Sequence, residues 1–326
     1  MKTQNSKLKT QNFKSKFKTF YLLVLLLTFA LCLLPFPANA QEFATGINPS
    51  ILFIETEPPA RIEAPISLSN QSDQTITYGI FLRPFKANSE KNGTPNYDPK
   101  LVSRYEEFFE GVQIQESDED ITEITLGPRQ SKDLMLRIRV EVGQPPQDRY
   151  FTVVFLAKPQ EGETKTNLAS ARAGIGTNVL LSIGQKSEPR GRITEFSSPA
   201  FLSKGPVPFK LELANPNDYY VVSEGNVVIK NMFGQIVGNL EFGPLSILAD
   251  SNRLVTNGNE VEGRLWWDEE YPIGIYTAEA KVALSEEGPL LVAEKAFIAF
   301  PFEVAAVIAL VIFSLVLKIE SFFSGF

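Results

Sequence analysis

Apolar and polar residues alternate with a period of two along most of the chain between residues 47 and 295. The pattern recurs in short runs at residues 47–53, 66–68, 76–82, 134–142, 151–155 and 179–183, and again in FKLELANPND, NVVIKNMFGQIVGNLEF, VEGRLWW and GIYTAEAKVAL. Alternation of this kind is typical of β-strands with one buried face, and turn-forming Pro, Gly, Asn and Asp bound the runs. The sequence therefore predicts an all-β fold of the sandwich class.

A polar stretch at residues 184–191, GQKSEPRG, divides these runs into two series. The chain is long enough to form two separate cores. We therefore expect two immunoglobulin-like β-sandwich domains in series, at residues 41–186 and 187–295. In the second, residues 231–235 predict a tight hairpin turn with Gly234 at positive φ. In the first, residues 66–82 (ISLSNQSDQTITYGIFL) predict a hairpin, with residues 70–74 as the turn and Ile66 and Leu68 paired opposite the second run.

The N-terminus has the order of a secretory signal peptide. Six lysines precede an apolar run, FYLLVLLLTFALCLLPF, and the small-residue site Ala38-Asn39-Ala40 follows it. We expect a signal peptide at residues 1–40, whose cleavage removes the only cysteine, Cys32. An uncleaved anchor is the alternative, although the run is short for a hydrocarbon core of roughly 30 Å.

A second apolar segment, AFIAFPFEVAAVIALVIFSLVLK, occupies residues 296–318. Its length favours a transmembrane helix, followed by a short cytoplasmic tail at residues 319–326. A buried core helix or a last strand is the alternative, because Pro301 and Glu303 shorten the clean run. The expected location is the cell membrane, with a single pass and the bulk of the chain extracytoplasmic.

Composition excludes several kinds of chemistry. The chain has 31 basic and 38 acidic residues, and loss of the six N-terminal lysines changes the balance to 25 − 38 = −13. Such an acidic chain is not expected to bind nucleic acid. The absence of histidine rules out a Ser-His-Asp triad and imidazole metal ligands, so we expect no enzyme activity and no cofactor. A carboxylate hydrolase stays formally open, as does calcium binding by the acidic residues 116–120, for which a solvated loop is the alternative.

Residues 86–120 are too long and too polar for a hairpin loop. We expect a short helix at residues 101–112, with Phe108 and Phe109 folded back on the sandwich. Loops of this length are usually functional or disordered, and both a binding loop and a mobile decoration are open. The adjacent Trp266 and Trp267 should point to opposite faces of a strand, one into the core and one toward solvent or a partner.

Three stretches of the first sandwich resemble the WxL-interacting surface proteins of Gram-positive bacteria. They are LSNQSDQTIT (residues 68–77), ANSEKNGTPNY (87–97) and ITLGPRQS (124–131). The resemblance implies a peptidoglycan-binding domain, a second β domain and a C-terminal membrane helix, with Asn88, Asn92 and Tyr97 as candidate ligand contacts. Trp266 and Trp267 are further candidates. The function implied is a membrane-anchored extracytoplasmic binding protein whose partners are the cell wall or another surface protein, and the membrane through its C-terminal helix.

The segment PQDRYF (residues 146–151) is similar to a turn before a strand in the N-terminal immunoglobulin-like domain of periplasmic pilus chaperones. This resemblance implies an alternative, a chaperone-like assembly factor for exported proteins that acts by β-augmentation. It predicts an unpaired, apolar-faced strand edge in the first sandwich, near a basic residue such as Arg61 or Arg83.

Overall fold

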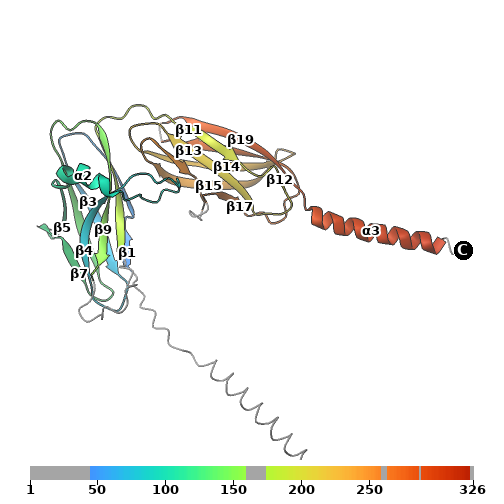
Figure 1. Cartoon of the computed structure of the whole chain (residues 1–326), viewed down its shortest axis with the longest axis horizontal. Helices are drawn as coiled ribbons and strands as arrows, with labels where there is room; N and C mark the ends of the chain where they lie inside the picture. Colours follow the sequence, from blue (N-terminus) through green and yellow to red (C-terminus); the bar gives the residue numbers. More distant parts are fainter. Residues whose placement is uncertain (1–44, 159–173, 258–262, 286–287, 324–326) are drawn as a thin grey trace, which may run out of the picture. The chain divides into compact units, whose positions relative to one another are not determined.

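The computed structural model describes residues 45–158, 174–257, 263–285 and 288–323. These residues belong to one compact unit, and the expected signal peptide, residues 1–40, lies outside them. Figure 1 shows β-strands through most of the described chain and the C-terminal helix α3 (Phe302–Phe323). Within the described ranges, we find no helix with the length and apolarity that crossing a bilayer requires.

The first sandwich contains two five-stranded sheets. The β1 sheet has the order β1-β3-β8-β5-β6, and the β2 sheet has the order β2-β10-β9-β4-β7. Neighbouring strands are antiparallel apart from the parallel pair of β2 and β10. The orders β1-β3-β8-β5 and β10-β9-β4 are those of an immunoglobulin-like sandwich. The strands are β1 (Thr45–Asn48), β2 (Ile51–Thr56), β3 (Ala60–Asn70), β4 (Ile76–Pro84), β5 (Val112–Glu116), β6 (Glu119–Asp120), β7 (Glu123–Leu126), β8 (Ser131–Val140), β9 (Gln147–Ala157) and β10 (Gly174–Ile183).

A short helical segment closes one part of the first core. The 3₁₀ helix η1 (Pro99–Leu101) leads into α2 (Val102–Phe109). Phe108 and Phe109 pack on the fully buried Phe151, with ring centroids 5.8 Å and 5.5 Å away. A helix with its two phenylalanines folded back was expected at residues 101–112; the helix is confirmed at Val102–Phe109, whereas Val112 begins β5.

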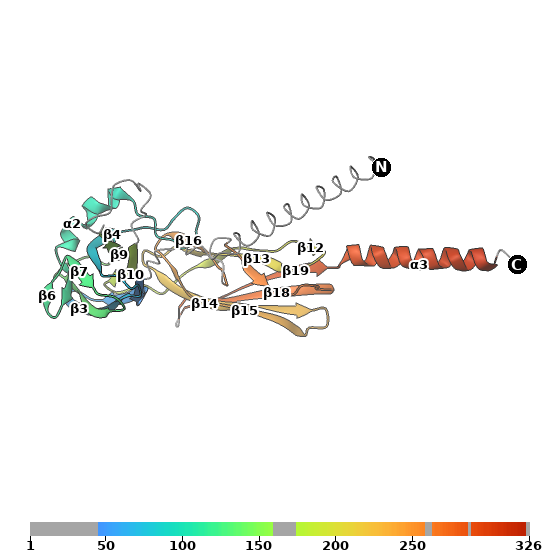
Figure 2. The same cartoon turned by 90° about the horizontal axis from the view of Figure 1, so that it is seen from below.

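The second sandwich repeats the two-sheet plan. The β13 sheet has the order β11-β13-β16, with β17 also paired to β13, and the β14 sheet has the order β12-β19-β18-β14-β15 (Figure 2). Residues 184–191 contain no strand, as expected for a linker, and Gly234 has φ 78° in the predicted hairpin turn. The strands are β11 (Arg192–Ser197), β12 (Phe201–Leu202), β13 (Val207–Asn215), β14 (Val221–Asn231), β15 (Ile236–Ile247), β16 (Ser251–Leu254), β17 (Leu265–Trp267), β18 (Gly274–Ala283) and β19 (Leu290–Ala299).

The C-terminal boundaries differ from those expected. Strand β19 continues to Ala299, because Phe297 and Ala299 are buried while Ile298 between them is exposed, as period two requires. The expected span at residues 296–318 therefore begins with strand residues, and the helix starts only at Phe302. The tail expected at residues 319–326 begins inside α3.

The hairpin predicted at residues 66–82 is wrong. Strand β3 pairs with β1 and β8 in one sheet, whereas β4 pairs with β7 and β9 in the other. Alternation had shown correctly which side chains point inward, but it does not show which sheet a strand joins. The residues between these strands form a corner that carries the chain across the core.

A buried asparagine organises this corner and its counterpart in the second sandwich. The amide nitrogen of Asn70, at the end of β3, donates to the carbonyls of Gln74 and Gly127 at 2.6 Å and 2.9 Å, and its oxygen accepts from Ser72. Asn215, at the end of β13, donates in the same way to Tyr219 at 2.8 Å and to the end of β15 at 2.9 Å. Both asparagines are 1 % exposed. Each one ties its strand to a strand of the opposite sheet.

Replacement of Asn215 by alanine should destabilise the second sandwich, because it leaves buried carbonyls without donors at about 1–3 kcal/mol each. Urea unfolding followed by tryptophan fluorescence isolates this effect, since the only two tryptophans lie in that sandwich. We expect a lower midpoint for Asn215→Ala. The control Asn239→Ala, at an exposed position on β15, should leave it unchanged. Equal midpoints for the two variants would contradict the assigned role.

Candidate protein-binding site

The outer face of the β2 sheet is unusually apolar for a solvent-facing surface. Across β4, β9 and β10, Leu156 lies between Gly79 and Gly174, and Val154 lies between Phe81 and Gly176. Leu156 and Val154 are only half-buried, and Phe81 is 45 % exposed. On the β10 side, Gly174 and Gly176 have no side chains and leave Leu156 and Val154 open, whereas on the β4 side the Phe81 ring lies over Gly79.

One edge of this sheet is open. Strand β2 pairs with β10 only from Asn178 to Ile183, and in the described part of the chain no strand forms backbone pairs with the same side of residues 174–177, although β1 lies close to β10. The cause is the crossing of the chain from β1 to β2, where the Thr177 hydroxyl donates to the carbonyl of Pro49 at 2.8 Å. The Asn178 N–H points to this side, because it donates to Ser50. By the two-residue period, Gly176 and Gly174 direct their N–H and C=O groups the same way.

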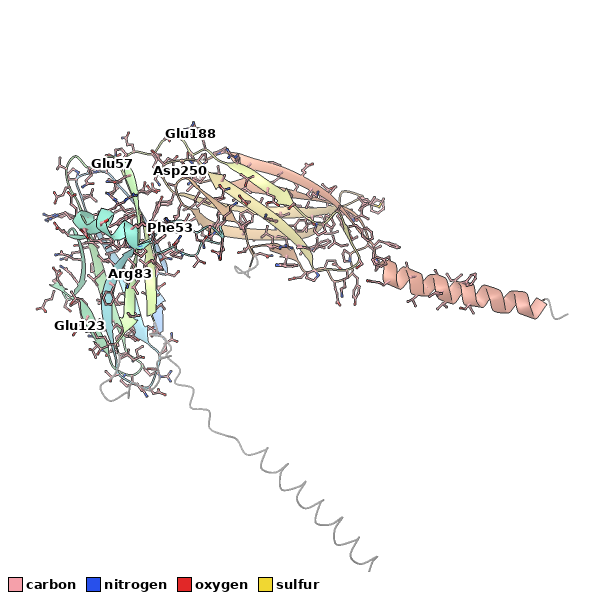
Figure 3. All side chains as sticks on the ribbon, viewed as in Figure 1. Phe53, Glu57, Arg83, Glu123, Glu188 and Asp250 are labelled. Carbon is pink, nitrogen blue, oxygen red and sulfur yellow. The ribbon has the colours of Figure 1, made fainter. Side chains whose placement is uncertain are left out.

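Apolar side chains flank the open edge, and a basic residue lies on the same face of the sheet. Arg83 is exposed on the outer face, where its backbone pairs opposite Thr152 in the row that continues to Asn178 (Figure 3). Ile51 and Phe53, on β2, are 38 % and 43 % exposed. Arg61, the other basic residue expected near such an edge, lies on β3 in the opposite sheet. The apolar-faced edge is present, and Arg83 lies on the same face of the sheet but two strands away from it, on β4.

The part of the same face that carries Tyr150 and Leu180 is covered by the second sandwich. Phe85, Tyr150 and Leu180 form a buried cluster with Tyr220. Asp148 accepts hydrogen bonds from the Tyr150 hydroxyl at 2.5 Å and from the Tyr220 N–H at 2.6 Å. Burial raises the pKa of Asp148, despite these hydrogen bonds, and raises the pKa of the Tyr150 and Tyr220 hydroxyls. This junction thus joins the two sandwiches through aromatic packing around a buried carboxyl.

Lys186, in the linker, reinforces the junction. Its ammonium group lies 4.2 Å from the centre of the Tyr220 ring and 2.5 Å from a carboxylate oxygen of Glu55. Phe53 packs against the same tyrosine, with ring centroids 5.9 Å apart. The first strand of the β2 sheet and the linker therefore hold Tyr220 from two sides.

The loop at residues 86–97 forms a second bridge to the second sandwich. The ammonium of Lys91 lies 2.7 Å from Glu212 on β13, and the Lys91 carbonyl accepts from the Leu254 N–H on β16 at 2.8 Å. A Cβ atom at Gly93 would fall 0.8 Å from the Arg253 guanidinium, and the φ of 82° at Gly93 favours glycine. Burial raises the pKa of Glu212, but hydrogen bonds from Lys91 and Asn252 outweigh it and hold the pKa below its ordinary value.

The candidate contacts predicted from the sequence lie within this loop and in the second sandwich. Asn88 donates to the Asn92 side-chain oxygen at 2.5 Å, and the same oxygen accepts from the Thr94 N–H. The Tyr97 hydroxyl lies 3.0 Å from that of Thr152, while its ring is 46 % exposed. The two asparagines shape the loop, and Tyr97 is the member of the three with a large exposed surface. A cavity of about 280 Å³ separates the loop from residues 246–253.

The two tryptophans point to opposite faces, as predicted. Trp267 is 7 % exposed and packs edge-on against Tyr276 and Phe297 in the second core. Trp266 is partly exposed, and its backbone pairs with the side chain of Asn257 at 2.9 Å and 3.0 Å. Trp267 therefore has a packing role, and only Trp266 presents a surface to solvent.

The acidic residues 116–120 contact polar and basic neighbours. Glu116 pairs with Lys132 at 2.7 Å, Asp118 with Arg137 at 3.0 Å, and Asp120 accepts from Gln113 at 2.7 Å. No group of three histidine, cysteine or carboxylate side chains that could hold a metal occurs within the described ranges.

The sequence predicted an unpaired edge in the first sandwich but did not place it on β10. Its signal is the alternation Gly174-Ile175-Gly176 at the start of a strand, which removes side chains from one face only. The junction residues Asp148 and Tyr150 lie in the PQDRYF segment that resembles pilus chaperones, but their partner Tyr220 comes from the other sandwich.

No family model and no curated protein sequence matches the chain. Among solved structures it is similar to the class 5 fimbriae chaperone CfaA, with 12% identity, 78% of this chain and 99% of that chain covered, and a TM-score of 0.36. The Pseudomonas aeruginosa CupB2 chaperone gives 12% identity, 75% and 96% coverage and a TM-score of 0.34. A complex of Salmonella enterica SafA pilin with the SafB chaperone gives 12% identity, 78% and 96% coverage and a TM-score of 0.35.

These structures belong to the second group that the first sandwich resembles, and no family model supports the WxL-interacting group. At such low identities and TM-scores the similarities carry no argument about function. The immunoglobulin-like description rests on the strand orders given above.

Acidification should release the loop at residues 86–97 from the second sandwich. Because the folded chain lowers the pKa of Glu212, its contribution to stability is present above the ordinary value of 4.5 and is lost as the pH falls through the folded value. Hydrogen exchange at the Leu254 amide, corrected for the intrinsic effect of pH, should report reduced protection. Lys91→Met should reduce that protection even at neutral pH. The control Lys132→Met, which breaks a surface pair elsewhere, should not; similar exchange in both variants would refute the bridge.

Proposed function

We propose that the chain is an extracytoplasmic, membrane-associated assembly factor whose first sandwich binds an extended segment of an exported protein by β-augmentation. The observation that carries this proposal is the open edge of β10, where Gly174 and Gly176 present backbone donors and acceptors. An unpaired edge of this kind is a template for an added strand. The binding is non-catalytic.

The outer face supplies the side-chain part of such a site. A strand added beside residues 174–177 projects alternate side chains over the outer face, where the glycines leave room beside Leu156 and Val154. Backbone hydrogen bonds then give affinity regardless of sequence, and the apolar surface selects for alternating apolar residues. Arg83 adds a cation for a carboxylate of the partner.

The alternative partner, the cell wall, has weaker support in the geometry. The Asn88 amide nitrogen donates to the Asn92 side-chain oxygen, which also accepts from the Thr94 N–H, and the Asn88 side-chain oxygen is buried. Of the predicted wall contacts, Tyr97 and Trp266 keep exposed surface. The chaperones among the similar structures agree with a protein partner, but the proposal rests on the strand edge.

Location at the membrane is part of the same proposal. It is supported by the N-terminal order of basic, apolar and small residues and by the second apolar segment near the C-terminus. A protein that lends a strand edge to exported partners works on the side of the membrane to which those partners are delivered.

Site-specific photocrosslinking tests the proposal in cells that produce the full chain. A benzophenone amino acid at Ile51, beside the open edge, should capture an exported protein whose presence protects the Gly174 and Gly176 amides from exchange. Gly174→Pro removes one outer N–H and should reduce the captured fraction by about fivefold or more. Gly174→Ala keeps the N–H and places its Cβ against the movable end of Leu156, so capture should persist.

The competing partner is tested in parallel by sedimentation of the full chain with purified cell wall. Sedimentation with the wall, together with capture that Gly174→Pro leaves intact, would overturn the proposal and favour wall binding. Loss of capture in both Gly174 variants would show that glycine itself, rather than the N–H, is required.

A further inference from the structure

Exposed apolar side chains gather at one end of the second sandwich. The registers Asn231↔Tyr276 and Gly274↔Ala299 place the β14–β15 turn, the start of β18 and the end of β19 at the same end. We call the set below the apolar collar. Its members and their exposures are Met232 (64%), Phe233 (78%), Ile236 (66%), Tyr271 (59%), Ile273 (63%) and Phe300 (45%).

The turn that carries the first three of these residues is firmly built. The side-chain oxygen of Asn231 accepts from the backbone N–H groups of Phe233 and Gln235, both at 3.0 Å. The Asn231 N–H donates to the Gln235 carbonyl at 3.0 Å, and Gly234 adopts the positive φ that closes the turn. Met232 and Phe233 are therefore held outward by a satisfied backbone, and presenting them to a partner requires no further ordering.

Helix α3 continues the apolar surface from the same end. It begins at Phe302, directly after the collar residue Phe300. Every large hydrophobic residue described from Val307 to Leu315 is more than half exposed. At 100° per residue these side chains point to all sides of the helix, and a helix that is apolar all round is matched by a protein core or by lipid. Phe201 contacts Phe302 at the start of the helix, and the exposure of the side chains from Val307 to Leu315 shows that no described segment covers them.

Charges near the collar restrict the kind of lipid. Asp268, Glu269 and Glu270 immediately precede Tyr271, and Glu303 lies in the first turn of α3. Lys204 is the cation on the adjacent segment, where the Gly205 N–H donates to the Glu270 carbonyl, and Lys230, next to the β14–β15 turn, pairs with Glu279 at 2.7 Å. The surplus of acids gives no attraction to anionic headgroups. Contact with lipid must then come from the apolar and aromatic side chains, of which Phe and Tyr suit the bilayer interface.

We propose that the apolar collar is a lipid-contacting surface that seats the second sandwich on the interface of a zwitterionic phospholipid bilayer. The collar is continuous with the apolar helix, a rigid turn presents Phe233, and the neighbouring charges are mostly acidic. The collar thereby fixes the distance between the membrane and the rest of the chain.

The test uses the full chain in phosphatidylcholine nanodiscs, with Cys32 replaced by serine and a bimane label on Gln235→Cys. Lipids brominated near the headgroup should quench most of the fluorescence of this label. A label on Glu188→Cys, in the linker before the second sandwich, should not be quenched. Adding anionic lipid should not increase the quenching.

Variants separate the collar from helix α3. Phe233→Ser combined with Ile236→Ser should remove most of the quenching at position 235 while the chain stays in the disc. Val142→Ser alters a side chain of equal exposure, 78%, on the first sandwich and should have no effect. The proposal is overturned if the label at position 235 is not quenched, if both labels are quenched equally, if the chain does not enter the discs, or if disulfide formation between Gln235→Cys chains shows the collar buried against a second copy.

Discussion

The two buried asparagines fix the position of one sheet relative to the other in each sandwich, and the rest of the structure depends on this alignment. Asn70 and Asn215 each end a strand of one sheet and bind carbonyl groups at the edge of the other. A buried amide that donates two or three hydrogen bonds leaves few alternative arrangements, since any slip orphans several polar groups at once. Asn217 extends the second corner by binding both backbone groups of Arg190 in the linker. The corner therefore also sets where the second sandwich begins.

The junction between the sandwiches grows from these fixed corners. Tyr220 follows the Asn215 corner by five residues and enters the aromatic cluster with Tyr150 and Phe85. The loop at residues 86–97 follows β4 and reaches β13 and β16 on the other side of the same junction. This long polar loop therefore connects the two sandwiches. Asn88 and Asn92 hold its fold by hydrogen bonds, and Gly93 packs closely against Arg253.

Local sequence patterns predicted local structure well and long-range pairing poorly. The alternation of apolar residues identified the two sandwiches, and Gly234 identified a hairpin turn whose two strands are adjacent in sequence. The same alternation misplaced residues 66–82, because period two gives the buried face of β3 and β4 but not the sheet that each strand joins. The sheet that each strand joins depends on long-range contacts, such as the hydrogen bonds from the Asn70 amide to the carbonyls of Leu126 and Gly127. The repeat of LSNQSD in the first sandwich as LANPND in the second was the available signal.

The candidate site was likewise predictable in its local features and not in its long-range pairing. Arg83 could be named from the sequence as a basic residue of the first sandwich, and it lies on the same face as the edge but two strands away, whereas the open edge depends on where β2 stops pairing with β10. The end of the second domain was placed too early for a related reason. Apolar residues that belong to β19 and those that belong to α3 are contiguous, and composition alone does not separate them.

The parallel pairing of β2 with β10 has a consequence for a chain under tension. When the N-terminal end of β2 and the C-terminal end of β10 are pulled apart, the pairs from Asn178↔Ile51 to Ile183↔Thr56 lie along the direction of the load. Their hydrogen bonds then resist together in shear instead of opening one after another. Because β10 leads directly into the linker, a pull on the linker loads this parallel pair directly.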